Sequence, residues 1–217
     1  IGRLGVGLDN IDVDACRARD IAVFPATGAN DVSVAEYVIA TAMLLLRGAY
    51  ASTPEVIAGR WPRNALIGRE IMGRRLGLVG FGSIARETGK RAAALGMRVT
   101  AFDPYVPAGS PAWSQPWGSV EAQPLDALLR ESDVVSLHVP LTPETRNLID
   151  AAALTRMRND AILINAARGG VVDEAALGDV ERLGALLRRR VGPPEGEVLA
   201  DRHGEQRRVL ERRRDHR

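Results

Sequence analysis

The strongest constraint on the fold is an alternation, between residues 76 and 179, of short apolar runs with amphipathic stretches. The runs are rich in β-branched residues and nearly all apolar, which is typical of parallel strands covered on both faces. The stretches between them are long enough for crossover helices, so the pattern predicts a doubly wound α/β fold with a parallel sheet. The expected strands span residues 75–80, 98–103, 133–139 and 161–167, and the expected helices span 84–95, 125–130, 145–157 and 174–183.

The residues before this region predict three further features. Residues 34–46 are apolar on nearly all sides and indicate a helix buried all round, with Ser33 and Glu36 forming a capping box at its start. We expect this helix to contribute to a subunit interface as well as to the core. Residues 50–70 contain the prolines and glycines of a connection, whereas residues 1–24 indicate a strand, a turn, a short helix and a strand.

Composition limits the class of protein. A chain of 217 residues with 46% hydrophobic and 26% charged residues is globular and holds one large domain, or one domain with part of another. Cys16 is the only cysteine, which excludes an internal disulfide and a multi-cysteine metal site and favours the cytoplasm. The longest apolar stretch, 37–46, is far short of the roughly 18 residues that cross a bilayer. The first residue is Ile1 and no secretory signal follows, so we expect a missing start.

The sequence changes character near Val180. Residues 1–179 carry 18 basic and 20 acidic side chains, a balance of −2, whereas residues 180–217 carry 11 and 7, a balance of +4. We expect an irregular, arginine-rich tail there. Seven acids interrupt its arginines and it has no aromatic residue for base stacking, which argues against nucleic-acid binding. Arginine outnumbers lysine 28 to 1, as GC-rich coding favours, so a reading-frame shift is our hypothesis for the tail.

A glycine-rich segment, Gly80-Phe81-Gly82-Ser83-Ile84-Ala85, joins a predicted strand to a predicted helix. Gly80 permits a tight turn, Gly82 lets a pyrophosphate approach the backbone, and Ala85 keeps the helix close to the strand. The free N–H groups and the positive dipole end of the helix then favour anion binding. A glycine turn without a ligand is the alternative for such a pattern by itself.

Asp103 supports a dinucleotide site. It lies 23 residues beyond Gly80 at the end of the next predicted strand, where a carboxylate can accept hydrogen bonds from both adenosine ribose hydroxyls. It also repels a 2′-phosphate, and no arginine lies in residues 104–107, so NAD is favoured over NADP. Gly5-Val6-Gly7 does not meet the same criteria, and Asp9-Asn10 after it indicates a turn.

Several separated motifs, in order along the chain, carry a resemblance to a known family. They are Gly5 to Asp12, Asn30 with Ser33 to Glu36, Gly77 to Ala85, Leu95 to Met97, Phe102 to Tyr105, Ser132 to Thr145, and Ile164 to Leu177. With these motifs the chain, from Gly2 to about Asp179, resembles the D-isomer-specific 2-hydroxyacid dehydrogenases. The likeness is closest to D-3-phosphoglycerate dehydrogenases and to glyoxylate or hydroxypyruvate reductases.

The resemblance implies a domain arrangement and a set of cofactor contacts. Residues 1–30 would be the remnant of a substrate domain, 31–179 the NAD-binding domain, and 180–217 the tail. In addition to Gly80 and Gly82, the resemblance implies Ser83 and Ile84 at the pyrophosphate and Asp103 at the adenosine ribose. It also implies Val139 and Pro140 on the adenine side, Ala166, Ala167 and Arg168 on the nicotinamide side, and Val6 on the opposite wall.

The reaction of this family needs a cation to grip the substrate carboxylate and a base to take the hydroxyl proton. Arg168 fits the first role, because its planar fork can hold a carboxylate through two bonds and Gly169 and Gly170 leave room beside it. The motifs that carry the family's glutamate and histidine are missing after Leu177. Glu197, His203 and His216 therefore receive no role, and His138 is interpreted as structural or cofactor-adjacent.

We therefore expect an NAD-dependent oxidoreductase that moves a hydride between nicotinamide and a 2-hydroxy acid such as 3-phosphoglycerate or glyoxylate/hydroxypyruvate. The chain would be a fragment with impaired activity, a homodimer, and would have no metal, membrane or nucleic-acid partner. The alternative is an NAD-binding module or scaffold without turnover, similar to the corepressors that share this fold. The substrate itself is not determined by the sequence.

Overall fold

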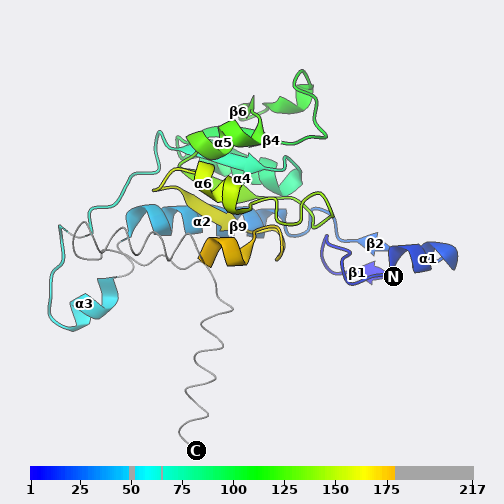
Figure 1. Ribbon diagram of the computed structural model, residues 1–217, viewed down its shortest axis with the longest axis horizontal. Helices are drawn as coiled ribbons and strands as arrows, with labels where there is room; N and C mark the ends of the chain where they lie inside the picture. The colour runs from blue at the N-terminus through cyan, green and yellow to red at the C-terminus, as the bar shows by residue number, and fades with distance from the viewer. Residues whose placement is uncertain (49–51, 65, 179–217) are drawn as a thin grey trace, which may run out of the picture.

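The computed structural model describes residues 1–48, 52–64 and 66–178 (Figure 1). Its centre is a five-stranded sheet with the order β7-β4-β3-β8-β9, in which every pair of neighbours is parallel. The strands are β3 (Arg75–Val79), β4 (Arg98–Phe102), β7 (Glu121–Ala122), β8 (Val134–Leu137) and β9 (Ile162–Asn165). The order runs in both directions from β3, which confirms the doubly wound α/β fold.

Two hydrophobic clusters, one on each face, hold the sheet between helices. On one face Leu76 and Leu78 of β3 pack with α2 (Asp31–Arg47) and α4 (Ser83–Ala94). On the other face Val79 packs with α5 (Leu125–Glu131) and α6 (Ala151–Arg156). Because both faces are covered, the four predicted strands are continuous apolar runs, and each is confirmed within one or two residues of its expected bounds.

Helix α2 differs from its prediction in two respects. It begins at Asp31 with Asn30 as its N-cap, so the capping box expected from Ser33 and Glu36 is wrong. It is also not buried all round. One side packs on the sheet and on α4, whereas four large apolar side chains on the other side are between 40% and 52% exposed, namely Val32, Tyr37, Met43 and Leu44.

The helix expected over residues 145–157 is shorter in the structure, where α6 begins only after Asp150. The Asp150 carboxylate accepts a hydrogen bond from the Ala153 N–H at 2.8 Å and caps the helix. The preceding residues form turns, in which Asn147 has a positive φ of 53° and Ile149 forms a β-bridge with Val172. Of the helix expected over 174–183, residues 174–178 are helical and the rest lies outside the described residues.

The smaller elements lie around this core. The first residues form β1 (Gly2–Arg3), α1 (Val13–Ala18) and β2 (Phe24–Pro25), as predicted, and β1 pairs with β2 in parallel. Figure 1 shows them beside the main sheet, at the opposite end of the molecule from α3 (Thr53–Ile57). The sequence did not predict α3, the edge strand β7, a 3₁₀ turn at Pro111–Trp113, or the hairpin of β5 (Ser114–Gln115) and β6 (Gly118–Ser119).

The described residues contain neither a membrane-spanning helix nor a metal-binding group of side chains. None of their helices is both long and apolar enough to cross a membrane. Within the same residues, no three or more His, Cys, Asp or Glu side chains are grouped so that they could hold a metal ion. The tail predicted for residues 180–217 and the side chains of Glu197, His203 and His216 lie outside the described part of the chain.

Candidate functional site

The glycine turn at the end of β3 has the geometry that its sequence predicts. Gly80 has a φ of +90°, in the left-handed region that side chains disfavour, and a Cβ there would lie 2.7 Å from the His138 carbonyl oxygen. Gly82 is the N-cap of α4 and offers no side chain to cap it. A Cβ on Gly82 would meet no atom within 4 Å. The first N–H groups of α4 thus have no side-chain cap, and the space beside Gly82 is open, so an anion can bind there.

Asp103 lies next to this turn. It follows β4, and its Oδ2 accepts a hydrogen bond from the Phe81 backbone N–H at 2.8 Å. Its Oδ1 accepts another from the Tyr105 N–H at 2.9 Å. These two bonds fix the carboxylate beside the glycine turn, at the carboxyl edge of the parallel sheet, where open α/β sheets bind ligands.

An aromatic stack anchors the glycine turn. The rings of Phe81 and Trp113 are stacked with centroids 4.9 Å apart, and the Arg86 guanidinium lies 5.4 Å from the centre of the Phe81 ring. The indole N–H of Trp113 donates to the Pro107 carbonyl at 2.8 Å. The stack thus ties the glycine turn to the segment after Asp103, so the two parts of the site hold each other in place.

The segment after β8 forms another wall. Val139 Cγ1 would lie 3.0 Å from a Cβ on Gly80, so Val139 contacts the turn directly. His138 beside it shares a hydrogen bond of 3.0 Å with the Ser136 hydroxyl. Burial lowers the pKa of His138 from 6.5 to about 4, so its ring is neutral at pH 7. His138 therefore takes up a proton only in acid, and its structural or cofactor-adjacent role stays a prediction.

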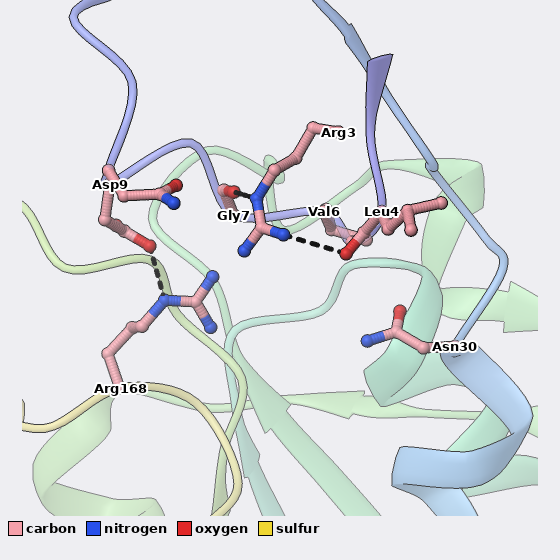
Figure 2. A pocket seen from close by; sticks show the side chains of 9 residues that line it. Arg3, Leu4, Val6, Gly7, Asp9, Asn30 and Arg168 are labelled. Atoms are coloured by element: carbon pink, nitrogen blue, oxygen red, sulfur yellow. Dashed lines mark hydrogen bonds and ion pairs between the residues drawn. The ribbon is translucent and has the colours of Figure 1, made fainter.

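A cavity of about 420 Å³ lies between the first residues of the chain and the segment after β9 (Figure 2). It brings Val6 and Arg168, two residues of the predicted site, together. Ala166 and Ala167 immediately precede Arg168, whereas the glycine turn and Asp103 do not line the cavity. Its lining consists of Arg3, Leu4, Gly5, Val6, Gly7, Asp9, Asn10, Asn30 and Arg168.

Arg168 is held in this cavity by an ion pair with Asp9, for which the sequence carries no signal. Its Nε donates to Oδ2 of Asp9 at 2.7 Å, and its Nη1 donates to the Ala167 carbonyl at 2.9 Å. The hydrogen bond from Arg168 lowers the pKa of Asp9, so Asp9 is charged at neutral pH. Asn165 fixes the loop, because its side-chain amide donates to the Arg168 carbonyl at 2.8 Å.

Comparison with known proteins places the chain in a family. Residues 39–187 match the model of the D-isomer specific 2-hydroxyacid dehydrogenase, NAD binding domain. Over 178 residues the chain is 61% identical to the (S)-sulfolactate dehydrogenase of Chromohalobacter salexigens, covering 82% of this chain and 56% of that protein. It is 44% identical to the D-3-phosphoglycerate dehydrogenase of Mycobacterium tuberculosis, covering 82% of this chain and 33% of the other.

A solved structure agrees with these matches. The D-lactate dehydrogenase of Aquifex aeolicus, complexed with NAD and lactic acid, superposes with a TM-score of 0.73 at 32% identity, over 85% of this chain and 54% of that one. The chain therefore belongs to the D-isomer specific 2-hydroxyacid dehydrogenases and carries their NAD-binding domain. Its identity to the sulfolactate dehydrogenase exceeds that to the phosphoglycerate dehydrogenase, whereas the motifs predicted the closest likeness to phosphoglycerate dehydrogenases and glyoxylate or hydroxypyruvate reductases.

The chain covers only part of the length of the proteins that it matches. It spans 56% of the length of the sulfolactate dehydrogenase and the same share of the hydroxypyruvate reductase of Thermotoga maritima. The residues present fit a dinucleotide at the glycine turn, since the space before Gly82 is open, the helix N–H groups are uncapped and an acid closes the next strand.

Proposed function

We propose that the chain is the NAD-binding part of an NAD-dependent oxidoreductase that interconverts a 2-hydroxy acid and the corresponding 2-oxo acid. The observation that carries the proposal is the position of Arg168. Its guanidinium enters a cavity, at the carboxyl edge of a sheet whose glycine turn and acid fit NAD. Such a cation can grip a substrate carboxylate and polarise the neighbouring carbonyl.

The cofactor would be held by residues from four strand ends. The N–H groups at Ser83 and Ile84 would bind the pyrophosphate, and the Asp103 carboxylate would accept from the adenosine ribose. Val139 and Pro140 would line the adenine side, Ala166, Ala167 and Arg168 would line the nicotinamide side, and Val6 would approach the cofactor from the opposite wall. Bound NAD supplies the hydride acceptor, and this chain's residues bind and orient the two reactants.

The substrate would be a small 2-hydroxy acid whose carboxylate meets Arg168. The names of the relatives support three candidates for the remainder of the molecule: a sulfonate as in sulfolactate, a phosphate as in 3-phosphoglycerate, or a small group as in hydroxypyruvate. We assign no general base among the described residues. Residues 1–30 would belong to the substrate domain, 31–179 to the NAD-binding domain and 180–217 to the tail, and the cavity would lie between the first two.

The test is NADH oxidation by the 217-residue chain with sulfopyruvate, phosphohydroxypyruvate, hydroxypyruvate and glyoxylate. We expect turnover that is weak, because a general base contributes about 10²–10⁴-fold and we assign none among the described residues, and that falls further in Arg168→Ala. Brisk turnover would contradict the expected impairment of the chain, and turnover unaffected by Arg168→Ala would contradict the role of Arg168. NADH binding without any turnover would favour the alternative of an NAD-binding scaffold.

A homodimer through α2 is part of the proposal. The exposed apolar residues Val32, Tyr37, Met43 and Leu44 form an uncovered side of this helix, and an apolar patch of this kind is typical of an interface. We expect sedimentation velocity to give a dimer, and Tyr37→Lys to give a folded monomer with unchanged NAD affinity. A wild-type chain that remains monomeric at high concentration would contradict this part of the proposal.

A further inference from the structure

The ion pair between Asp9 and Arg168 joins two parts of the chain that are 159 residues apart in sequence. Asp9 lies in the turn after Gly5-Val6-Gly7, and Arg168 follows β9. Figure 2 shows the Asp9 carboxylate directed at Arg168 from one wall of the cavity. Both side chains are partly exposed, with 49% and 40% of their surface accessible, so the contact is reachable by a ligand.

Within the part of the chain that the structure describes, the hydrogen bonds of Arg168 leave donors on both terminal nitrogens unused. An arginine has five N–H donors in a fixed fork. Of these, Nε–H is taken by Asp9 and one Nη1–H by the Ala167 carbonyl. Three donors remain on the two terminal nitrogens, enough for a two-bond grip on a carboxylate through Nη1 and Nη2.

Gly7 contributes to the same arrangement. A Cβ placed on Gly7 would coincide with Nη2 of Arg168, so the guanidinium occupies the space that any other residue would fill. Asp9 thus holds Nε of Arg168, and the lack of a side chain on Gly7 makes room for Nη2. Gly7 and Asp9 belong to the segment around Gly5-Val6-Gly7, which does not meet the criteria for a dinucleotide site. Their contacts show that this segment instead surrounds the Arg168 guanidinium.

We propose that Asp9 is a positioning residue, which holds Arg168 so that its terminal nitrogens present a fixed pair of donors to the substrate carboxylate. This inference rests on the proposed function, and deepens it by assigning the group that orients the carboxylate-binding arginine. Without Asp9, the long arginine side chain would sample other rotamers, and a ligand would have to order it on binding. Asp9 itself does not touch the substrate.

The test compares Asp9→Ala and Asp9→Asn with Asp14→Ala, a control acid on the same segment whose side chain is 90% exposed and pairs with Arg17. The first readout is the ¹H–¹⁵N signal of Arg168 Nε–H, assigned by its loss in Arg168→Lys. We expect a shifted, slowly exchanging signal in the wild type that moves to the free-arginine position in Asp9→Ala. It should stay in Asp14→Ala and be partly restored in Asp9→Asn, whose amide oxygen can still accept.

The second readout is the affinity of the NADH-loaded chain for oxamate, a stable carboxylate analogue of a 2-oxo acid. We expect Asp9→Ala to weaken oxamate binding by roughly tenfold, because a charge-assisted hydrogen bond that preorganises the arginine is lost. NADH affinity and melting temperature should stay unchanged. Oxamate affinity in Asp9→Ala within twofold of the wild type would overturn the inference.

Failure of the proposed function would look different. If the chain bound NADH but no oxamate, the assigned activity would fail, and the Arg168 Nε–H signal would still decide the positioning role. A signal that does not respond to Asp9→Ala would overturn that role whatever the ligand result. A signal that responds to Asp9→Ala but not to Asp14→Ala would support it.

Discussion

The backbone N–H of Phe81 donates a hydrogen bond of 2.8 Å to Oδ2 of Asp103, joining the glycine turn of one strand to the acid of the next. The Gly80 N–H adds a second link, donating to the Phe102 carbonyl at 2.8 Å. These bonds bring together the two elements on which the assignment of a dinucleotide site depends. The same carboxylate that would read the ribose also fixes the turn, so changes at Asp103 should affect both halves of the site.

Substitution by alanine should destabilise the folded chain at Gly80 but hardly at Gly82. Gly80→Ala would place a Cβ at a φ of +90° and 2.7 Å from the His138 carbonyl, so we predict a loss of at least about 1–2 kcal/mol in the free energy of unfolding. Gly82 has a φ of −75° and open space around it, so Gly82→Ala should change stability by less than about 0.5 kcal/mol.

The stable Gly82→Ala variant should instead be impaired in NAD binding. The Cβ of Gly82→Ala would occupy the space in front of the helix N-terminus, so NAD affinity should fall about tenfold or more, which corresponds to about 1.4 kcal/mol. Urea unfolding and NAD titration of both variants make the check. An unstable Gly82→Ala, or one that binds NAD like the wild type, would contradict the geometry.

The partly buried imidazole of His138 predicts a pH dependence of stability. Its pKa in the folded chain is about 4, below the ordinary 6.5, because burial disfavours the charged form. The unfolded chain therefore binds more protons between these values, and stability present above pH 6.5 is lost as the pH falls towards 4. The slope of this contribution approaches about 1.4 kcal/mol per pH unit.

The comparison that isolates His138 is urea unfolding of wild type and His138→Gln from pH 7.5 to 4.5. The stability difference between the two should change within this window, in the sense that the wild type loses more than the variant on acidification. Carboxylates with lowered pKa values, such as Asp9, affect both proteins equally. Parallel curves would show that His138 is protonated as easily in the folded chain as in the unfolded chain.

Asp133 should matter for stability although it is remote from the site. Its Oδ2 accepts from the Arg75 N–H at 2.9 Å at the start of β3, and its Oδ1 lies 3.4 Å from Nη1 of Arg74. Only 9% of its side chain is exposed, so Asp133→Ala would leave partly buried donors unpaired and cost about 2 kcal/mol.

Asp126 is the matched control for that variant. It also pairs with an arginine, Arg156 at 3.5 Å, but 56% of its side chain is exposed. Asp126→Ala should therefore change the unfolding free energy by less than about 0.5 kcal/mol. Equal effects of the two substitutions in thermal or urea unfolding would show that burial is not what gives Asp133 its importance.

The coenzyme preference follows from the charge of Asp103. A carboxylate at the ribose repels a 2′-phosphate, so we predict that the wild type binds NADP at least about tenfold more weakly than NAD. Asp103→Asn removes the repulsion and should reduce the preference for NAD over NADP, chiefly by lowering the affinity for NAD. A wild type that binds both coenzymes equally would contradict the position assigned to the acid.

The sequence predicted the sheet and the dinucleotide loop well because both have local signals. Strands covered on both faces are continuous apolar runs, and the glycine spacing at Gly80 and Gly82 reflects backbone geometry. The start of α6 was missed because polar side chains bind the backbone before it. The hydroxyl of Thr145 accepts from the Thr142 N–H and donates to the Pro140 carbonyl, which stabilises turns in place of a helix.

Other features had no local signal to find. β7 has two residues, too few for a periodicity, and joins the sheet only through its pairing with β4. The exposed side of α2 was not predicted, because apolar residues on all sides of a helix indicate burial but do not show which neighbour covers each side. The Asp9–Arg168 pair joins residues from opposite ends of the described chain, and in one sequence Asp9 indicated only a turn.

The most direct test of the central claim is calorimetric titration of NAD into the 217-residue chain and its Asp103→Ala variant. We predict saturable binding of one NAD per chain by the wild type, and an affinity reduced about tenfold to a hundredfold in Asp103→Ala, since charge-assisted hydrogen bonds to the ribose are lost. Binding that is absent in the wild type, or equally tight in the variant, would contradict the assignment of the turn and its acid as the dinucleotide site.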